Sequence, residues 1–242
     1  MGGADRADER GSDVPDGRAP KGDVYRGALA ARYHRSRSAD PKWDQEQAAL
    51  AQLLRSIPQG VTVLDVPFGT GRFLPEYGDR GLRVTGLDSS EDMLAAAREV
   101  IAELGADPGA VDMHIGDALA MPFDDASFDV VVCVRFLASV VALVDAPVVL
   151  AEVARLARTF AIVQFRVPPS DDALPATKAP DERMEHQCGR ADQDLLLARA
   201  GLGVVDEVWD RDEDGGGLRL VLCRRDGSVA PARTLPESWG LR

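Results

Sequence analysis

Acidic side chains and a glycine turn stand at the ends of three stretches that are typical of buried strands. Asp65 and the turn of residues 67–71 follow "VTVLDV". Asp88 follows "LRVTGL", and Asp117 ends "VDMHIGD". The carboxyl ends of parallel strands meet at one edge of a sheet, where such sheets bind their ligands. A carboxylate there has two acceptor oxygens for a ribose diol, and a glycine turn lets the main chain approach closely. The pattern therefore predicts a nucleotide or nucleoside site.

The charge of this crevice favours one class of nucleotide. A dinucleotide places its pyrophosphate on the helix after the turn, with an acid at the end of the second strand on the ribose. Asp88 suits that ribose, but "GTGRFL" lacks a third glycine and Asp65 would lie beside the phosphates. S-Adenosylmethionine has no phosphate, and its methionine end carries an ammonium beside a sulfonium. The carboxylate of Asp65 therefore favours S-adenosylmethionine over NAD.

Hydrophobic periodicity predicts the elements that position these residues. Helices are expected over residues 44–57, 91–104, 146–158 and 191–201, with a short one near 73–77. Strands are expected over 61–66, 82–87, 111–117, 128–134, 160–167, 202–210 and 217–225. The last two are joined by "EDGGG", too short for a parallel crossover, so they form an antiparallel hairpin. The alternation predicts an α/β fold: a doubly wound, mostly parallel seven-stranded Rossmann-like sheet with a terminal antiparallel strand.

Four segments of the chain resemble class I S-adenosylmethionine-dependent methyltransferases. They are "VLDVPFGTGRF", "VTGLDSSEDMLAAAREV", "GDALAMPFDDASFDVVVCVRFL" and the terminal hairpin, within roughly residues 45–225. The run "PFDDASFDVVV" after a Gly-Asp pair is a specific mark of that superfamily, although not of one substrate. The resemblance implies that the protein binds S-adenosylmethionine and transfers its methyl group.

The resemblance also implies a role for residues at each strand end. Asp65, Gly69 and Gly71 match the motif at the methionine end of the cofactor. Asp88 matches the acid that binds both ribose hydroxyls, and Asp117 matches the acid that accepts from the adenine amine. The other matching positions are Ser89 and Met93 against adenine, Ala118 beside Asp117, and Val134 and Arg135, where a main-chain carbonyl contacts the methionine amine.

Two positions depart from the family's pattern. Pro67 replaces the first glycine of the turn, which removes one N–H donor and fixes φ near −65°. We interpret Pro67 as part of a stiffened turn in the cofactor site, because Gly69 and Gly71 still permit close approach. "RFLASV" lacks the histidine pair often found where Ala138 and Ser139 stand, so no base is assigned there.

The acceptor side is expected to come from segments outside the strands. Residues 23–43 are similar to the N-terminal segment that closes over the cofactor in the family, and the loop 168–190 completes the pocket. Tyr33 and His186 are the candidate catalytic residues on these segments, with a solvated surface side chain as the alternative for each. The predicted division is a disordered acidic tail at 1–22, a lid segment at 23–43, the methyltransferase domain at 44–225 and an irregular tail at 226–242.

Composition narrows the classes of partner. The 242 residues are 45% hydrophobic and 28% charged, as expected for one α/β domain with tails. A net charge of −12 repels the phosphate backbone of nucleic acid.

No apolar stretch resembles a signal peptide or a membrane span. The three isolated cysteines fit a reducing compartment, and the three histidines show no zinc spacing, so we expect a cytoplasmic protein without a metal site.

The leading hypothesis is a methyltransferase that acts on the oxygen or nitrogen of a small molecule by in-line transfer. A base is needed only where the acceptor must lose a proton early. Two alternatives stay open: an RNA or protein methyltransferase, and a catalytically inactive S-adenosylmethionine-binding subunit that supports a partner. The sequence names neither the acceptor nor the oligomeric state.

Overall fold

The computed structural model of the protein describes residues 30, 34, 41–105, 109, 111–141, 143–169, 188–212, 215–228 and 232–234. Its elements are α2 (Pro41–Leu54), β1 (Thr62–Asp65), α3 (Leu74–Asp79), β2 (Arg83–Asp88), α4 (Glu91–Glu103), β3 (Asp112–Ile115), β4 (Phe128–Cys133), the 3₁₀ helix η3 (Leu143–Asp145), α5 (Ala146–Leu156), β5 (Ala157–Val167), α6 (Arg190–Arg199), β6 (Leu202–Arg211) and β7 (Gly217–Arg225). The predicted helices and strands are present, with ends that differ by a few residues.

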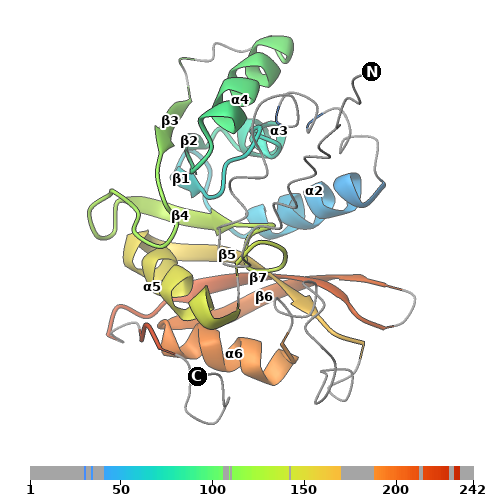
Figure 1. Cartoon of the computed structure of the whole chain (residues 1–242), viewed down its shortest axis with the longest axis vertical. Helices are drawn as coiled ribbons and strands as arrows, with labels where there is room; N and C mark the ends of the chain where they lie inside the picture. Colours follow the sequence, from blue (N-terminus) through green and yellow to red (C-terminus); the bar gives the residue numbers. More distant parts are fainter. Residues whose placement is uncertain are drawn as a thin grey trace, which may run out of the picture.

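Within the described residues, seven strands form one sheet in the order β3-β2-β1-β4-β5-β7-β6 (Figure 1). The strands from β3 to β5 pair in parallel with their neighbours, whereas β7 pairs antiparallel with both β5 and β6. The last strand of the chain therefore lies between β5 and the edge strand β6. The prediction of a doubly wound, mostly parallel α/β sheet with a terminal antiparallel strand is confirmed.

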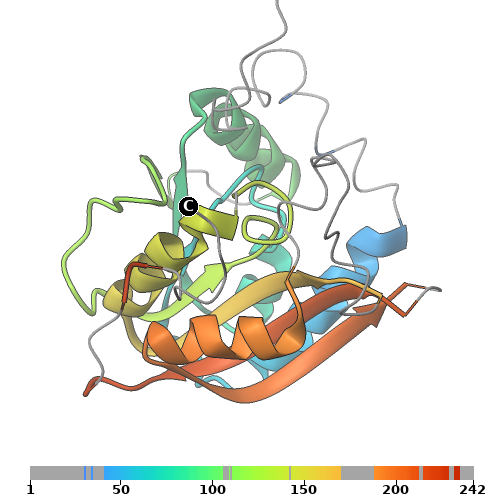
Figure 2. The ribbon, with the colours of Figure 1, turned by 60° about the horizontal axis from the view of Figure 1, so that its bottom comes forward.

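Both faces of the sheet are covered by helices. Alternate residues of β4 join different hydrophobic clusters: Val130 and Val132 pack with residues of α2, and Val131 and Cys133 with residues of α5 and α6. Figure 2 shows α6 on the near side of the sheet and α2 behind it. Because each face of β4 is buried, its sequence is apolar at nearly every position rather than at every second one.

One predicted helix end is wrong. The helix expected to reach residue 158 ends at Leu156, and β5 begins at the next residue, Ala157, which is already extended with φ −68° and ψ 127°. The Arg155 carbonyl accepts a hydrogen bond from the Ala126 N–H (2.8 Å). The end of α5 is thus tied to the loop before β4, and the chain enters β5 without a connecting loop.

The predicted division at the N-terminus falls within a helix. α2 begins at Pro41, so the boundary drawn between residues 43 and 44 lies inside it. Trp43 is buried, as are Leu50, Leu53 and Leu54 further along the same helix. Most of the predicted tails at 1–22 and 226–242 lies outside the described residues, and their character stays a prediction.

The described residues contain no disulfide, no cluster of metal ligands and no membrane-spanning helix. Cys133, Cys188 and Cys223 are buried and form no disulfide. No group of three or more His, Cys, Asp or Glu side chains within the described ranges is arranged to hold a metal ion. None of the helices in the described part of the chain has the length and apolar character that crossing a membrane requires.

A fully buried arginine fixes α6 on the β6–β7 hairpin. Arg219 of β7 forms ion pairs of 2.7 Å with Asp194 of α6 and with Glu207 of β6. Its Nη1 also donates to Gln193 Oε1 (3.2 Å), and Arg190 pairs with Glu207 at 2.8 Å. A buried guanidinium is tolerated only where carboxylates and acceptors surround it. These contacts therefore anchor the last helix to the strands that complete the sheet.

We predict that Glu207→Gln lowers the free energy of unfolding by roughly 1–3 kcal/mol, because it removes one of the two charges that neutralise Arg219. Urea denaturation followed by circular dichroism measures the change. Asp206→Asn, one residue earlier on the same strand and exposed, is the control and leaves the midpoint unchanged. Equal midpoints for the two variants would show that Arg219 does not depend on Glu207.

Candidate functional site

The turn between β1 and α3 brings the main chain close to the ends of β1 and β2. Gly69 and Gly71 have φ of +57° and +70°, conformations that L side chains rarely adopt. A Cβ at Gly71 would lie 2.7 Å from Leu74 Cδ1, so the Leu74 side chain would have to move to admit it. The Phe68 N–H donates to the Leu87 carbonyl (2.8 Å) and ties the turn to β2. The two glycines are thus required by the shape of the turn.

Asp88, the last residue of β2, joins this turn to the start of α4. Its Oδ2 accepts from the Gly69 N–H (2.8 Å) and its Oδ1 from the Ser90 N–H (2.9 Å). Burial raises the pKa of Asp88, and the N–H groups of Ser90, Gly69 and Ser89 oppose the rise because they stabilise the carboxylate. A carboxylate oxygen accepts two hydrogen bonds, so each oxygen retains capacity for a ligand beside the turn.

Asp65, the last residue of β1, is buried without a full set of partners. Its carboxylate and the Tyr77 hydroxyl lie near each other but outside ordinary hydrogen-bond geometry, and neither Oδ2 nor the hydroxyl has another partner among the described residues. Burial raises the pKa of Asp65 well above its ordinary value. The nearby Tyr77 hydroxyl lowers this pKa, the charge of Asp88 raises it, and the Arg72 guanidinium lowers it. A buried carboxylate is stabilised by a cation or by protonation. The end of β1 therefore suits a positively charged ligand group.

The start of α4 covers the turn. Ser90 is the N-cap, and its Oγ accepts from the Met93 N–H (3.3 Å). Met93 is buried, and its Cε lies 3.5 Å from the point where a Cβ on Gly69 would stand. Ser89 is exposed. Met93 thus forms an apolar wall beside the glycine turn.

The register of β3 brings Asp117 to the same edge of the sheet. Ile115 pairs with Asp88, and Asp117 follows two residues later. The Asp117 side chain is exposed, and its Oδ1 accepts from the Leu119 N–H (2.9 Å). Ala118 is buried in the hydrophobic cluster that includes α5. Asp117 therefore has a carboxylate oxygen to which no described residue donates, at a strand end next to Asp88.

Arg155 of α5 fixes the loop between β3 and β4. Its guanidinium donates to the carbonyls of Met121 (3.0 Å) and Phe123 (2.7 Å). It also pairs with Asp125 at 2.9 Å and with Glu152 at 2.7 Å. Glu152 accepts from the Met121 N–H as well (3.0 Å). The loop with the sequence "PFDDASFD" is thus held by two charged residues one helical turn apart, and this sets the path of the chain after Asp117.

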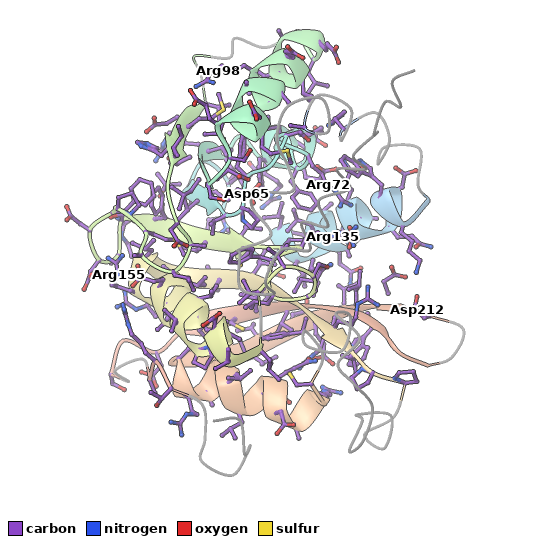
Figure 3. The ribbon with its side chains drawn as sticks, viewed as in Figure 1. Asp65, Arg72, Arg98, Arg135, Arg155 and Asp212 are labelled. Atoms are coloured by element: carbon purple, nitrogen blue, oxygen red, sulfur yellow. The ribbon has the colours of Figure 1, made fainter. Side chains whose placement is uncertain are left out.

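A buried polar network joins α2 to the ends of β4 and β5. Glu46 Oε2 lies 2.6 Å from Arg72 Nη1, and its Oε1 lies 3.3 Å from Arg135 Nη1. Gln164 donates from Nε2 to Glu46 Oε1 (3.0 Å) and accepts from the Arg135 N–H (3.0 Å). Figure 3 shows Asp65, Arg72 and Arg135 in the centre of the molecule, between α4 and the α5–α6 layer. Val134, the neighbour of Arg135, is buried.

The sequence analysis did not single out Glu46, Arg72, Gln164 or Arg155. Gln164 interrupts the apolar strand "FAIVQFRV", and a polar residue inside a strand buried on both faces is a signal that would have found it. Glu46 gives no such signal, because it stands among other polar residues in "KWDQEQ". Only the packing of α2 over the strand ends shows that this one carboxylate is buried.

Part of the predicted lid lies against the glycine turn. His34 Nδ1 and Thr70 Oγ1 are 3.1 Å apart, and the His34 ring meets the Trp43 ring edge to face with centroids 5.4 Å apart. Burial lowers the pKa of His34. The candidate catalytic residues Tyr33 and His186 lie outside the described residues.

The structure thus gathers most of the predicted cofactor residues at one edge of the sheet. Asp88 accepts from the Gly69 N–H, Met93 lies on the side of Gly69 where a Cβ would point, and Pro67 is half-buried within the turn. Asp65 pairs in register with Val132, which places the end of β1 beside the end of β4. β1 and β4 run parallel, but successive strands are added outward from β1 on one side and from β4 on the other, and open α/β sheets bind ligands at such a switch point.

Comparison with known proteins supports this assignment of the fold. The family model described as "Methyltransferase domain" matches residues 63–159. Phosphatidylethanolamine N-methyltransferase from Cereibacter sphaeroides is 43% identical over 100 residues, which is 41% of this chain and 47% of the relative. Demethylmenaquinone methyltransferase from Listeria monocytogenes is 40% identical over 94 residues, which is 37% of each chain. The match spans less than half of the length of either relative.

A solved structure has the same fold over a longer stretch. The crystal structure of magnesium protoporphyrin IX methyltransferase from Synechocystis PCC 6803 with bound SAH superposes with a TM-score of 0.56. It is 19% identical and covers 76% of this chain and 82% of its own. The strand order, the glycine turn and the matched family agree with the resemblance seen in the sequence. Residues 63–159 therefore match a methyltransferase domain, and this match and the strand order support the resemblance of the chain to class I S-adenosylmethionine-dependent methyltransferases.

Proposed function

We propose that the protein transfers a methyl group from S-adenosylmethionine to an oxygen or nitrogen of a small molecule. The observation that carries the proposal is the Asp88 carboxylate, which is held by the Gly69 and Ser90 N–H groups at the edge of the glycine turn. Each of its oxygens retains a lone pair, and together they suit the two hydroxyls of a ribose. Asp88 is therefore the proposed ribose ligand.

The charge of the site supports S-adenosylmethionine over a phosphate-bearing nucleotide. Asp65 is buried at the end of β1 with an unpartnered Oδ2, and a pyrophosphate near it would add like charge. The methionine end of S-adenosylmethionine instead supplies an ammonium and a sulfonium, which stabilise a buried carboxylate. The donor set of the site thus fits the cofactor of the superfamily.

The proposed contribution of the chain is positioning. S-Adenosylmethionine, when bound, supplies an electrophilic methyl group on its sulfonium. Asp88 holds the ribose, Asp117 accepts from the adenine amine, and Met93 packs beside the turn on the adenine side. The Val134 carbonyl and the Asp65 carboxylate orient the methionine amine. A neutral amine acceptor then needs no base before transfer, and alignment and exclusion of water supply the rate enhancement.

A small-molecule acceptor agrees with the charge of the protein and with its relatives. The net charge of −12 disfavours binding to RNA. The two curated relatives are named for phosphatidylethanolamine and demethylmenaquinone, and both are small molecules. The three free, buried cysteines are compatible with the reducing cytoplasm as the proposed location.

We predict that Asp88→Asn weakens binding of S-adenosylhomocysteine by at least about tenfold, because an amide has one acceptor oxygen where the carboxylate has two. Isothermal titration calorimetry measures the affinity. Asp79→Asn removes an exposed acid at the end of α3 and is the matched control, with unchanged affinity. Tight binding of NAD without binding of S-adenosylhomocysteine would contradict the proposed cofactor.

We predict that Asp65→Asn becomes more stable relative to the native protein as the pH rises. The folded-state pKa of Asp65 is raised, so ionising this group in the folded protein costs free energy. The cost is absent below the ordinary Asp pKa of about 4, grows above it, and is complete above the raised pKa. Urea denaturation between about pH 4 and pH 8 measures the difference in free energy of unfolding. A difference that is constant with pH would contradict a raised pKa.

We predict that label from [methyl-³H]S-adenosylmethionine enters the metabolite fraction of a cell extract rather than its RNA or protein. The extract is incubated with the purified protein, separated into the three fractions and counted, and Asp88→Asn is the inactive control. Label confined to RNA or protein would overturn the small-molecule acceptor. No transfer to any fraction, together with tight binding of S-adenosylhomocysteine, would favour the alternative of an inactive subunit.

A further inference from the structure

Two guanidinium groups contact the same carboxylate in the buried network beneath α2. Glu46 is its single carboxylate among the described residues, and two guanidinium groups, Arg72 and Arg135, share it. Gln164, the fourth member, is neutral. All four side chains are buried or half-buried. A buried guanidinium that has only a shared carboxylate beside it is costly unless an anion completes its surroundings.

The two arginines differ in how well they are neutralised. Arg72 lies 2.6 Å from Glu46, donates to the Trp43 carbonyl (2.8 Å) and stacks on the Trp43 ring at 4.1 Å. It is also close enough to Asp65 and Glu76 to lower the pKa of both carboxyls. Its charge therefore has several partners within the protein.

Arg135 has a much weaker set of partners. Its Nη1 lies 3.3 Å from Glu46 Oε1, an oxygen that already accepts from Gln164 Nε2 at 3.0 Å. The Arg135 side chain is 23% exposed, so a ligand can reach it. Asp212 does not serve as a second counter-charge, since it pairs with Lys42 at 2.7 Å, and Figure 3 shows it apart from Arg135. Among the described residues, Arg135 is thus the cation of this network that is least neutralised.

The main chain of Arg135 is held in an unusual conformation. Its φ is +64°, in the left-handed region that side chains other than glycine seldom adopt. The Arg135 N–H donates to Gln164 Oε1, and Gln164 is itself fixed by Glu46, so β5 and α2 together impose this conformation. Strained residues of this kind persist where the surrounding structure holds them, often at ligand sites. Arg135 directly follows Val134 at the end of β4, beside the end of β1 at the switch point of the sheet.

We propose that the Arg135 guanidinium binds a carboxylate of a bound ligand, and that Gln164 and Glu46 orient it for this role. The proposal rests on the proposed function, which places the methionine end of the cofactor at the ends of β1 and β4. Two ligands can present a carboxylate there: the amino-acid end of S-adenosylmethionine, and the methyl acceptor. Arg135 then complements Asp65, which suits a cationic group at the neighbouring strand end.

The test compares ligands with and without a carboxylate on the full-length protein. S-Adenosylhomocysteine and 5′-methylthioadenosine share the adenosine and the thioether, but only the first has the amino-acid group. Their affinities for the native protein, Arg135→Met and Arg135→Lys are measured by calorimetry. Arg98→Met, which removes an exposed arginine from α4, is the matched control. A second arm titrates benzoate, and benzamide as its neutral analogue, into the proteins saturated with S-adenosylhomocysteine, followed by ligand-observed NMR.

The ligand is the cofactor carboxylate if Arg135→Met weakens binding of S-adenosylhomocysteine about 10-fold or more and leaves binding of 5′-methylthioadenosine unchanged. Arg135→Lys then restores part of the lost affinity for S-adenosylhomocysteine. An acceptor carboxylate is shown if nucleoside affinities stay the same while the native protein binds benzoate, but not benzamide, and Arg135→Met does not. Unchanged nucleoside affinities with no benzoate binding that depends on Arg135 overturn the proposal. Equal weakening of both nucleosides also overturns it, because that result describes a structural role.

Failure of the proposed function has a different signature. In that case the native protein binds neither nucleoside, whatever residue stands at position 135. Titration of benzoate into the protein without nucleoside then tests separately whether Arg135 binds a carboxylate.

Discussion

The hydrogen bond from the Gly69 N–H to Asp88 Oδ2 connects the two elements on which the site depends. It joins the glycine turn after β1 to the last residue of β2, and the second oxygen of the same carboxylate holds the start of α4 through Ser90. Neither the glycine turn nor the start of α4 is positioned by its own sequence alone. Because Asp88 is buried, its pKa rises, and these N–H donors are what keep the carboxylate favourable. One side chain therefore shapes the crevice and retains the lone pairs that a ribose would use.

Charge is distributed unevenly around the switch point of the sheet. An acid with an unpartnered oxygen, Asp65, stands at the end of β1, and a weakly neutralised base, Arg135, stands at the end of β4. Both are costly in a protein interior without a ligand. A zwitterionic amino-acid group has the charges that would neutralise them. A net charge of −12 does not oppose the proposed anion site at Arg135, because acids on the surface act on a buried guanidinium less than its immediate neighbours do.

The supporting layer of the fold is built from arginines that reach across several elements. Arg155 holds the β3–β4 loop from the side of α5, and Arg219 holds α6 against β6 and β7. In each case a planar guanidinium with several donors meets acceptors from elements far apart in sequence. These contacts tie the loop after Asp117 to α5 and the β6–β7 hairpin to α6.

Local patterns in the sequence determined the elements, the glycine turn and the acids at the strand ends. Apolar runs and the glycines at 69 and 71 act within a few residues, so their consequences can be read without knowledge of the fold. Asp65, Asp88 and Asp117 were found together because parallel strands end at the same edge. Tertiary structure alone decided that β7 lies between β5 and β6, that Glu46 is buried, and that Gln164 fixes the Arg135 main chain. Those features depend on contacts between residues about thirty to more than a hundred positions apart, as in the pair Gln164 and Glu46. No local propensity encodes which of several polar residues on a helix will meet a partner once the elements have packed.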